Sequence, residues 1–327
     1  MNLNKKKVLL VVPKYYHYEK EIKKALVEQG AKVIIIYDNL AGCNLYYRMY
    51  YIYMKKKYDT VIYKYYKKRL KRIKKLDVVL AINASSINES IFELIKHYCR
   101  EESKFYLYLW DSVKNNSHAL SISSIFDKVY TFDIDDSQKY GWKYRPLFYV
   151  NRLTNSNAKK DIDVSYMCTW HSKRAQILRR IKKEIAEQDL VFYNNMYAPF
   201  ILFMKHKYIN KNLEYKQVSL KEISFKSLSL KGCYKLYQKS KVVVDYTHPG
   251  QTGLTMSTIE CLGNKCKLVT NNTLIKKADF YNENNILVYE DENVEIPREF
   301  ISTPYESIPD NIYNYYSLKN WLKSIFA

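Results

Sequence analysis

The sequence predicts an α/β protein built from two successive doubly wound domains. Three observations predict it. Short apolar, β-branched segments recur in both halves, segments with helical periodicity separate them, and a polar stretch without a pattern, residues 151–160, divides the halves. Strands that alternate with helices pair in parallel, and the helices then cover both faces of the sheet. A chain of 327 residues suits two domains of this kind.

Five apolar segments of the first half are expected to be strands, because they are short and rich in β-branched residues. They are residues 7–13, 32–38, 77–84, 104–111 and 128–133. A helix is expected at residues 18–29, where Gly30 follows in a C-cap position. Together these elements predict an N-terminal domain of residues 1–152.

The same alternation resumes after the polar stretch and predicts a second domain, residues 161–310. Its expected strands are residues 163–169, 190–194, 241–246, 267–271 and 286–289, and its expected helices are residues 172–188, 233–240 and 255–262. In the last segment, residues 311–327, apolar side chains repeat at helical spacing, which predicts a terminal amphipathic helix packed across the fold. They are Leu318, Trp321, Leu322 and Ile325.

The chain has a strong excess of basic residues, with 54 Lys and Arg against 33 Asp and Glu and a formal net charge of +21. This excess favours an anionic partner, for which nucleotide phosphates, nucleic acid and anionic lipid head groups all qualify. The six cysteines form no CxxC pair, which indicates reduced thiols and no zinc site.

No segment has the length of a membrane span. The apolar run at residues 8–12 is too short for the core of a signal peptide, and no run approaches the ~20 apolar residues that cross a bilayer. We therefore expect a cytoplasmic protein, at most peripheral on the inner face of the plasma membrane.

Residues 248–255, HPGQTGLT, lie between an expected strand and an expected helix, where open α/β sheets bind their ligands. Gly250 and Gly253 let backbone N–H groups approach a phosphate, and the helix start adds the positive end of its dipole. Glu260, one to two turns into that helix, can accept hydrogen bonds from a ribose diol. A plain tight turn with a solvated Glu260 explains the pattern equally well. The sequence has neither a P-loop nor GxGxxG, which disfavours an ATPase or a dehydrogenase.

Residues 251–272, QTGLTMSTIECLGNKCKLVTNN, resemble the GT-B glycosyltransferase-like family that includes the CgeB spore proteins and many capsule and lipopolysaccharide biosynthesis proteins. Residues 108–112, 132–136, 140–141, 145–149 and 279–281 agree with the resemblance. It implies two Rossmann-like domains facing a cleft. Two positions depart from the family pattern, because Ser257 stands where an arginine is expected nearby and Thr252 stands where an acidic residue is commoner.

The resemblance implies an enzyme that moves a sugar from a nucleotide diphosphate sugar to a hydroxyl acceptor, saccharide or lipid-linked, in bacterial surface polysaccharide or glycolipid synthesis. No metal or cofactor is expected. Glu260 would hold the ribose, and Arg174, ranked above Lys173, would neutralise the departing diphosphate. Alternatively, these two cations are an exposed basic helix start. The other implied donor-binding residues are His248, Gln251, Thr252, Gly253, Leu254 and Thr255.

Two residues compete for the role of catalytic base. His17 follows the first expected strand, where several inverting GT-B enzymes keep a histidine, but it also suits a surface position before a helix. Asp111 follows the fourth expected strand and either faces the cleft or caps the next helix. The acidic run Asp133, Asp135 and Asp136 lies in the first domain and is expected to cap a helix rather than to bind a metal.

Residues 44–76 hold twelve Lys and Arg against one acid, with nine interleaved tyrosines. Ile62, Tyr66, Leu70 and Ile73 fall on one helical face, and the other faces are cationic. Such a helix suits an anionic membrane surface, with nucleic-acid binding and a merely solvated helix as rivals. The residues expected to form this patch are Lys64, Lys67, Lys68, Arg69, Lys71 and Arg72.

A second function from another class is also compatible with the sequence. A basic, tyrosine-rich chain on a degenerate GT-B fold could be a non-catalytic nucleic-acid-binding or coat protein, because a fold alone does not establish an activity.

Overall fold

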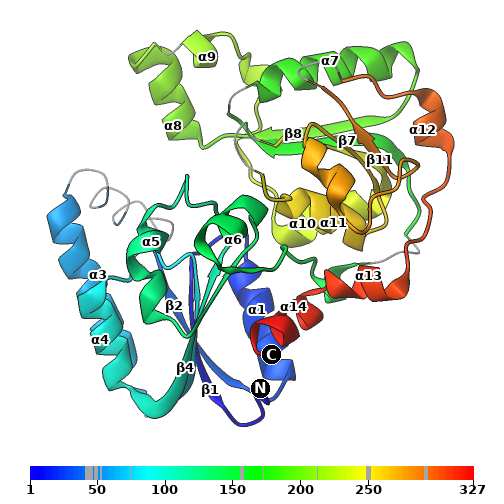
Figure 1. Ribbon diagram of the computed structural model, residues 1–327. Coiled ribbons are helices and arrows are strands. Elements are labelled where there is room, and N and C mark those ends of the chain that lie inside the picture. The colour runs from blue at the N-terminus through cyan, green and yellow to red at the C-terminus, as the bar shows by residue number, and fades with distance from the viewer. Residues whose placement is uncertain are drawn as a thin grey trace. The chain divides into compact units, whose positions relative to one another are not determined.

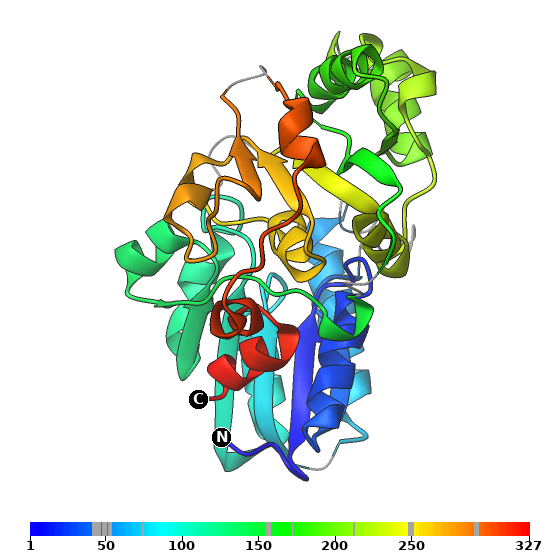
Figure 2. The same ribbon diagram turned by 90° about the vertical axis from the view of Figure 1, so that its right-hand side faces the viewer.

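The computed structural model describes the chain except residues 41–46, 48–50, 52–53, 74, 155–157, 172, 212, 248–251 and 291–293. The chain divides into two compact units. Unit 1 comprises Met1–Leu147 and Leu318–Ala327, and unit 2 comprises Phe148–Ser317. In each unit, helices cover both faces of a parallel sheet (Figures 1 and 2).

Unit 1 contains a six-stranded sheet in the order β2-β1-β3-β4-β5-β6, and all its described pairs are parallel. The strands are β1 (Lys7–Val12), β2 (Lys32–Tyr37), β3 (Leu76–Ile82), β4 (Cys99–Leu109), β5 (Lys128–Thr131) and β6 (Lys143–Tyr144). The helices are α1 (Tyr18–Glu28), α3 (Lys55–Leu70), α4 (Glu89–His97), α5 (His118–Ile122), η2 (Ser123–Ile125), α6 (Ile134–Tyr140) and α14 (Leu318–Ile325).

One face of this sheet packs against α3, α4 and α5. Tyr58, Ile62, Tyr66 and Leu70 recur every four residues along α3, and all four are buried in that core. The apolar face predicted for this helix is therefore used inside unit 1, because its spacing matches one side of a helix.

The other face of the sheet packs against α1 and the terminal helix α14. Helix α1 ends before Gly30, whose φ of +87° is the left-handed conformation expected at that position. A residue with a side chain would be strained at this φ, and its Cβ would lie 2.7 Å from Oδ1 and 3.0 Å from Cα of Asn4.

Unit 2 contains a five-stranded parallel sheet in the order β11-β10-β9-β7-β8. The strands are β7 (Ile162–Thr169), β8 (Phe192–Tyr197), β9 (Ser240–Asp245), β10 (Lys267–Thr270) and β11 (Ile286–Val288). The helices are η3 (Asn151–Leu153), α7 (Arg174–Glu187), α8 (Phe200–Met204), η4 (Lys205–Ile209), α9 (Leu213–Lys216), η5 (Leu220–Glu222), α10 (Leu230–Lys239), α11 (Met256–Gly263), η6 (Thr273–Lys277), α12 (Arg298–Ser302) and α13 (Asp310–Tyr315).

The doubly wound architecture predicted from the sequence is confirmed, with small shifts at element ends. Helix α7 begins at Arg174, two residues later than expected, with Lys173 as its N-cap residue. Strand β8 also begins later than predicted, and the short strand β6 was not anticipated. The largest feature without a sequence prediction is the run of short helices between β8 and α10.

The terminal helix α14 belongs to unit 1, although the residues before it belong to unit 2. Leu318, Trp321, Leu322 and Ile325 are buried, as their spacing predicts. The hydroxyl of Tyr130 on β5 donates to the carbonyl of Ile325 at 3.1 Å. The helix therefore packs on a sheet formed by residues about 200 positions earlier in the chain.

Among the described residues, no helix is long and apolar enough to cross a membrane, and no three His, Cys, Asp or Glu side chains are grouped to hold a metal ion. The five described cysteines are free thiols. Burial raises the pKa of the Cys99 thiol to about 12, so it is protonated at neutral pH.

Replacing Trp321 with alanine should destabilise unit 1 by about 3–5 kcal/mol. The indole is fully buried, and its centroid lies 4.6 Å from that of the Tyr108 ring. Urea unfolding of the full chain followed by circular dichroism measures the loss. The exposed Lys319→Ala in the same helix is the control. Equal midpoints for the two variants would contradict this account of α14.

Candidate functional site

Each sheet has one place where the chain reverses its direction of winding. In unit 1 the chain steps from β1 to β2 on one side and then to β3 on the other, and in unit 2 it steps from β7 to β8 and then to β9. The loops that follow β1 and β3 in unit 1, and β7 and β9 in unit 2, diverge at this place. Ligands of open α/β sheets bind there, outside the carboxyl ends of the strands.

In unit 2, Arg174 lies at this position. Its Nη1 donates to the carbonyl of Thr169 at 2.7 Å, and its Nη2 donates to the carbonyl of Tyr246 at 2.9 Å. Thr169 ends β7 and Tyr246 follows β9, so one guanidinium ties together the two strand ends that flank the reversal. The alternative of a merely exposed basic helix start is wrong for Arg174, which is half-buried. Lys173 is exposed.

Asp245, the last residue of β9, is a buried carboxylate near the Arg174 charge, and it was not among the predicted site residues. Its Oδ2 accepts a hydrogen bond from the Thr255 hydroxyl at 2.9 Å. Burial raises the pKa of Asp245, and the Arg174 charge opposes that rise. Thr255 also caps α11, because its Oγ1 accepts from the Thr258 N–H at 3.1 Å. The strand end thus determines where α11 begins.

The loop before α11 is partly described. Gly253 and Leu254 are buried and Thr252 is half-buried, while His248 and Gln251 lie outside the described residues. The Thr247 N–H donates to Oδ1 of Asn271 at 2.7 Å, which ties this loop to the residue after β10. The predicted donor-binding stretch is therefore attached to both neighbouring strands.

Glu260 lies on α11 and is 3 % exposed, so the alternative of a solvated Glu260 is wrong. It faces α10. Burial raises the pKa of the Cys233 thiol on α10 to about 12, and the charge of the nearby Glu260 adds to this rise. A carboxylate buried in this way is costly unless it is paired or hydrogen-bonded. Ser257, near which an arginine was expected, makes a hydrogen bond that opposes the rise in the pKa of Asp245.

In unit 1, Asp111 follows β4 and is held by a side-chain amide. Nδ2 of Asn83 donates to Oδ2 of Asp111 at 2.5 Å, while Oδ1 of Asn83 accepts from the Trp110 N–H at 3.0 Å. The protein around the carboxyl raises the pKa of Asp111, and the hydrogen bond from Asn83 opposes this rise. More than a third of the residue remains exposed. The carboxyl is both oriented and accessible.

His17 is exposed and precedes α1 with a φ of +71°. Its Nδ1 lies 3.7 Å from Oε1 of Glu19, a fully buried carboxylate. The ring of Tyr15, two residues earlier, lies 6.1 Å from the Trp110 ring. The loops that carry the two base candidates, His17 and Asp111, therefore lie side by side.

A second carboxylate organises the same edge of unit 1. Asp38 follows β2 and is fully buried, and each of its oxygens accepts two hydrogen bonds at 2.7–2.9 Å. The donors are the backbone N–H groups and hydroxyls of Ser85 and Ser86. Asp38 thus shapes the loop after β3, whose first residue is Asn83. Asp38, Asn83 and Asp245 share one sequence signal, a polar residue at the end of an apolar strand.

The acidic run after β5 caps a helix, as predicted. Asp133 is the N-cap residue of α6, and its Oδ1 accepts from the N–H groups of Asp135 and Asp136 at 3.0 and 3.1 Å. The Asp136 carboxylate accepts from the Val113 N–H at 2.7 Å. These carboxylates are used in local structure.

The cationic patch on α3 is exposed, but the apolar face behind it is buried in unit 1. Insertion of that apolar face into a membrane, as an amphipathic surface helix would require, is therefore wrong for the described part of α3. The exposed cations are Lys64, Lys67, Lys68 and Arg69 on α3, and Lys71 and Arg72 directly after it. Arg69 also donates to the carbonyl of Ile35 at 3.0 Å.

No protein-family model matches this sequence, and no curated protein matches it either. By structure, the chain is similar to a glycosyltransferase from Rickettsia africae, with a TM-score of 0.56 and 14 % identity over 99 % of this chain and 97 % of that one. It is also similar to Anabaena HepE in complex with UDP-glucose, with a TM-score of 0.56 and 11 % identity over 98 % of each chain.

An α-glucosyltransferase solved with UDP and a 13-mer DNA is a third similar structure, with a TM-score of 0.56 and 13 % identity over 88 % of this chain and 87 % of that one. At these identities the likeness concerns the fold. The narrower similarity to CgeB-type proteins stays a prediction. With two parallel sheets, each wound by helices, this chain has the GT-B fold of two Rossmann-like domains.

Proposed function

We propose that this protein is a glycosyltransferase that moves a sugar from a nucleotide diphosphate sugar to a hydroxyl acceptor. The observation that carries the proposal is the arrangement in unit 2, where Arg174, Asp245 and Thr255 join the ends of β7 and β9 to the start of α11. Ligands of open α/β sheets bind outside the carboxyl ends of the strands where the direction of winding reverses, which supports a ligand site at this position. The similar α-glucosyltransferase was solved with UDP and HepE was solved with UDP-glucose, which supports a uridine nucleotide as the donor carrier.

In this proposal unit 2 holds the donor. Backbone N–H groups of residues 252–255, together with His248 and Gln251, bind the diphosphate near the start of α11. Glu260 accepts hydrogen bonds from the ribose diol. Arg174, with Lys173 beside it, neutralises the charge that develops on the leaving diphosphate. These assignments need no metal ion.

The proposed reaction balances without a further reactant. The acceptor oxygen forms a bond to the anomeric carbon, the bond from that carbon to the diphosphate breaks, and the nucleoside diphosphate leaves with its electron pair. The hydroxyl proton passes to a base in unit 1. We assign this role to Asp111 ahead of His17, because Asn83 orients its carboxyl and its raised pKa suits a base. The acceptor is proposed to be a bacterial surface polysaccharide or glycolipid.

Uridine nucleotides should raise the melting temperature of the protein. A ligand at 100 times its Kd adds about 2.7 kcal/mol to the stability of the state that binds it. A thermal-shift panel of UDP, GDP, CDP and dTDP sugars measures this effect. Glu260→Gln should reduce the shift, while the exposed Glu299→Gln in the same unit should retain it. If no nucleotide stabilises the wild type, the donor site is not where we place it.

Asp111→Asn should lower kcat about 10²–10⁴-fold, the usual contribution of a general base. His17→Gln is the matched comparison, because it removes the rival base. Single-turnover kinetics of sugar release from the best donor measure the rate of each variant. A loss confined to His17→Gln would transfer the role to the histidine.

Asn83→Gly should move the acid limb of the kcat/KM profile to higher pH. The amide of Asn83 donates to the charged form of Asp111 and lowers its pKa, so removing the amide raises that pKa and delays the formation of the base. Glycine can adopt the backbone conformation of this position, since Asn83 has a φ of +61°. An unchanged limb would mean that Asp111 is not the titrating base.

A second candidate function rests on the exposed cations of α3. They favour binding of a nucleic acid, and one similar structure was solved with DNA. The nucleic acid would be either the partner of a non-catalytic protein or the acceptor of the transferred sugar. Lys64→Gln, Lys67→Gln and Lys68→Gln together should then weaken binding to a DNA duplex and reduce its salt slope by about 2–3. Fluorescence anisotropy from low to high salt measures this. Unaltered binding would remove the candidate.

A further inference from the structure

The chain leaves the edge strand β8 and runs through α8, η4, α9 and η5 before it returns as α10. This excursion occupies residues 198–229 and projects from the sheet of unit 2 in Figure 1. It starts at the carboxyl end of β8, the same sheet edge as the candidate donor site. No residue in it has a role in the proposed function.

The excursion exposes several large apolar side chains. Ile201, Ile209 and Leu213 are 72 %, 73 % and 72 % exposed. Four further large side chains of the excursion are also exposed. One of them is Leu220, and the other three join these residues in what we call the α8–α9 patch. Its members are Phe200, Ile201, Leu202, Tyr208, Ile209 and Leu213. Single exposed apolar residues are ordinary, but a group of this size on one short segment indicates a binding surface.

Contacts to the body of unit 2 hold the base of the excursion in place. Phe203 is buried, and its ring and that of Tyr215 lie 5.7 and 4.1 Å from the ring of Trp170, which follows β7. Nζ of Lys207 donates to the carbonyls of Tyr215 and Val218 at 3.0 and 2.5 Å. The side chains of the α8–α9 patch are therefore exposed to solvent, although other side chains of the same segment pack against the body of unit 2.

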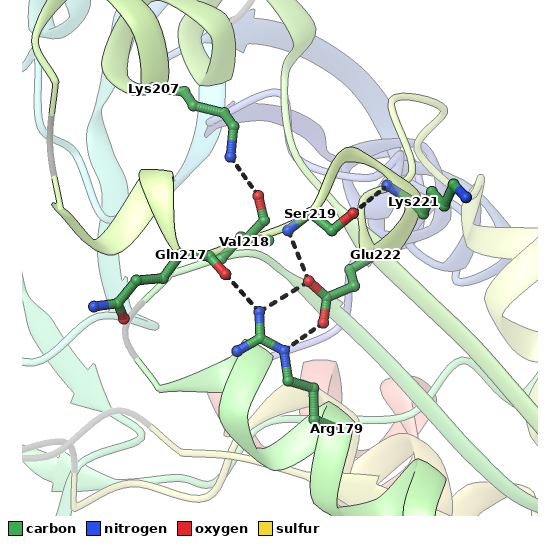
Figure 3. A network of polar contacts seen from close by, with 7 residues as sticks. All are labelled: Arg179, Lys207, Gln217, Val218, Ser219, Lys221 and Glu222. Atoms are coloured by element: carbon green, nitrogen blue, oxygen red, sulfur yellow. Dashed lines mark hydrogen bonds and ion pairs between the residues drawn. The ribbon is translucent and has the colours of Figure 1, made fainter.

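Figure 3 shows the second set of these contacts. Arg179 on α7 donates to both carboxylate oxygens of Glu222, at 2.6 and 2.9 Å, and to the carbonyl of Gln217 at 2.7 Å. Since α7 also begins with Arg174, the excursion and the candidate donor loop share one helix. The Glu222 charge is paired with Arg179, so this acid does not offset the exposed lysines of the excursion.

Lysines are interleaved with the apolar side chains. Residues 198–221 contain five lysines and one acid, Glu214. Four of the lysines are exposed, namely Lys205, Lys211, Lys216 and Lys221. The cores of protein–protein interfaces are depleted in lysine, whereas surfaces that lie on anionic bilayers combine lysine with Leu, Ile, Phe and Tyr.

We propose that the α8–α9 patch docks on a lipid bilayer with anionic head groups. The apolar side chains enter the boundary between head groups and acyl chains, and the neighbouring lysines contact the phosphates. On α3, by contrast, the apolar face is buried and only the cations remain exposed. The excursion is the described segment that offers both parts of such a contact.

Vesicle flotation tests the proposal, with phosphatidylcholine vesicles that contain roughly 30 % phosphatidylglycerol. The wild type should float with these vesicles. Ile201→Ser, Ile209→Ser and Leu213→Ser together should reduce the bound fraction at least about tenfold, because three apolar contacts are lost without a change in charge. These side chains are exposed, so circular dichroism and the melting temperature should stay unchanged.

The control is Lys64→Gln, Lys67→Gln and Lys68→Gln on α3, which should retain most of the binding at physiological salt. A wild type that does not float, or a triple-serine variant that floats like it, would overturn the proposal. A dimer seen by sedimentation velocity and broken by the serine variant would also overturn it, since the patch would then join two copies of the chain. The nucleotide thermal shift, measured on the same variants, reports the donor site separately.

Discussion

The contact on which the candidate donor site depends is one guanidinium between two strand ends. Carbonyl groups at the carboxyl end of a parallel sheet lack partners once the ladder stops, and a buried unpaired carbonyl is costly. Arg174 satisfies the carbonyls of Thr169 and Tyr246 with charge-assisted hydrogen bonds. The nearby Asp245 balances its charge and holds Thr255, so the start of α11 follows from the same contact.

Unit 1 uses side-chain amides and hydroxyls for the corresponding task. Asp38 accepts four hydrogen bonds from two consecutive serines, and this holds the loop after β3 in a conformation where Asn83 has a positive φ. Asn83 can then reach both the Trp110 N–H and the Asp111 carboxylate. The two units share a strand order through their first five strands but secure their strand ends with different chemistry, a guanidinium in unit 2 and a buried carboxylate with serine and asparagine side chains in unit 1.

The basic excess of the chain is distributed over surfaces of two kinds. On α3 the cations surround a helix whose apolar side is part of the core, so only electrostatic contact with a partner remains. On the excursion after β8, Lys205 and its neighbours lie among exposed apolar side chains such as Ile201 and Ile209. The first kind suits any polyanion and weakens with salt, whereas the second also gains from removing apolar area from water.

The doubly wound architecture, most strand positions, the terminal helix and the capping role of Asp133 can be predicted from the sequence, because these depend on local periodicity and local hydrogen bonds. The sequence did not determine that Glu260 is buried, that Arg174 bridges two strands, or that the excursion exposes large apolar side chains. Those depend on pairs of residues far apart in the chain, such as Arg174 and Tyr246. Only the packing of the sheet brings them within hydrogen-bond distance, and no pattern along the sequence records it.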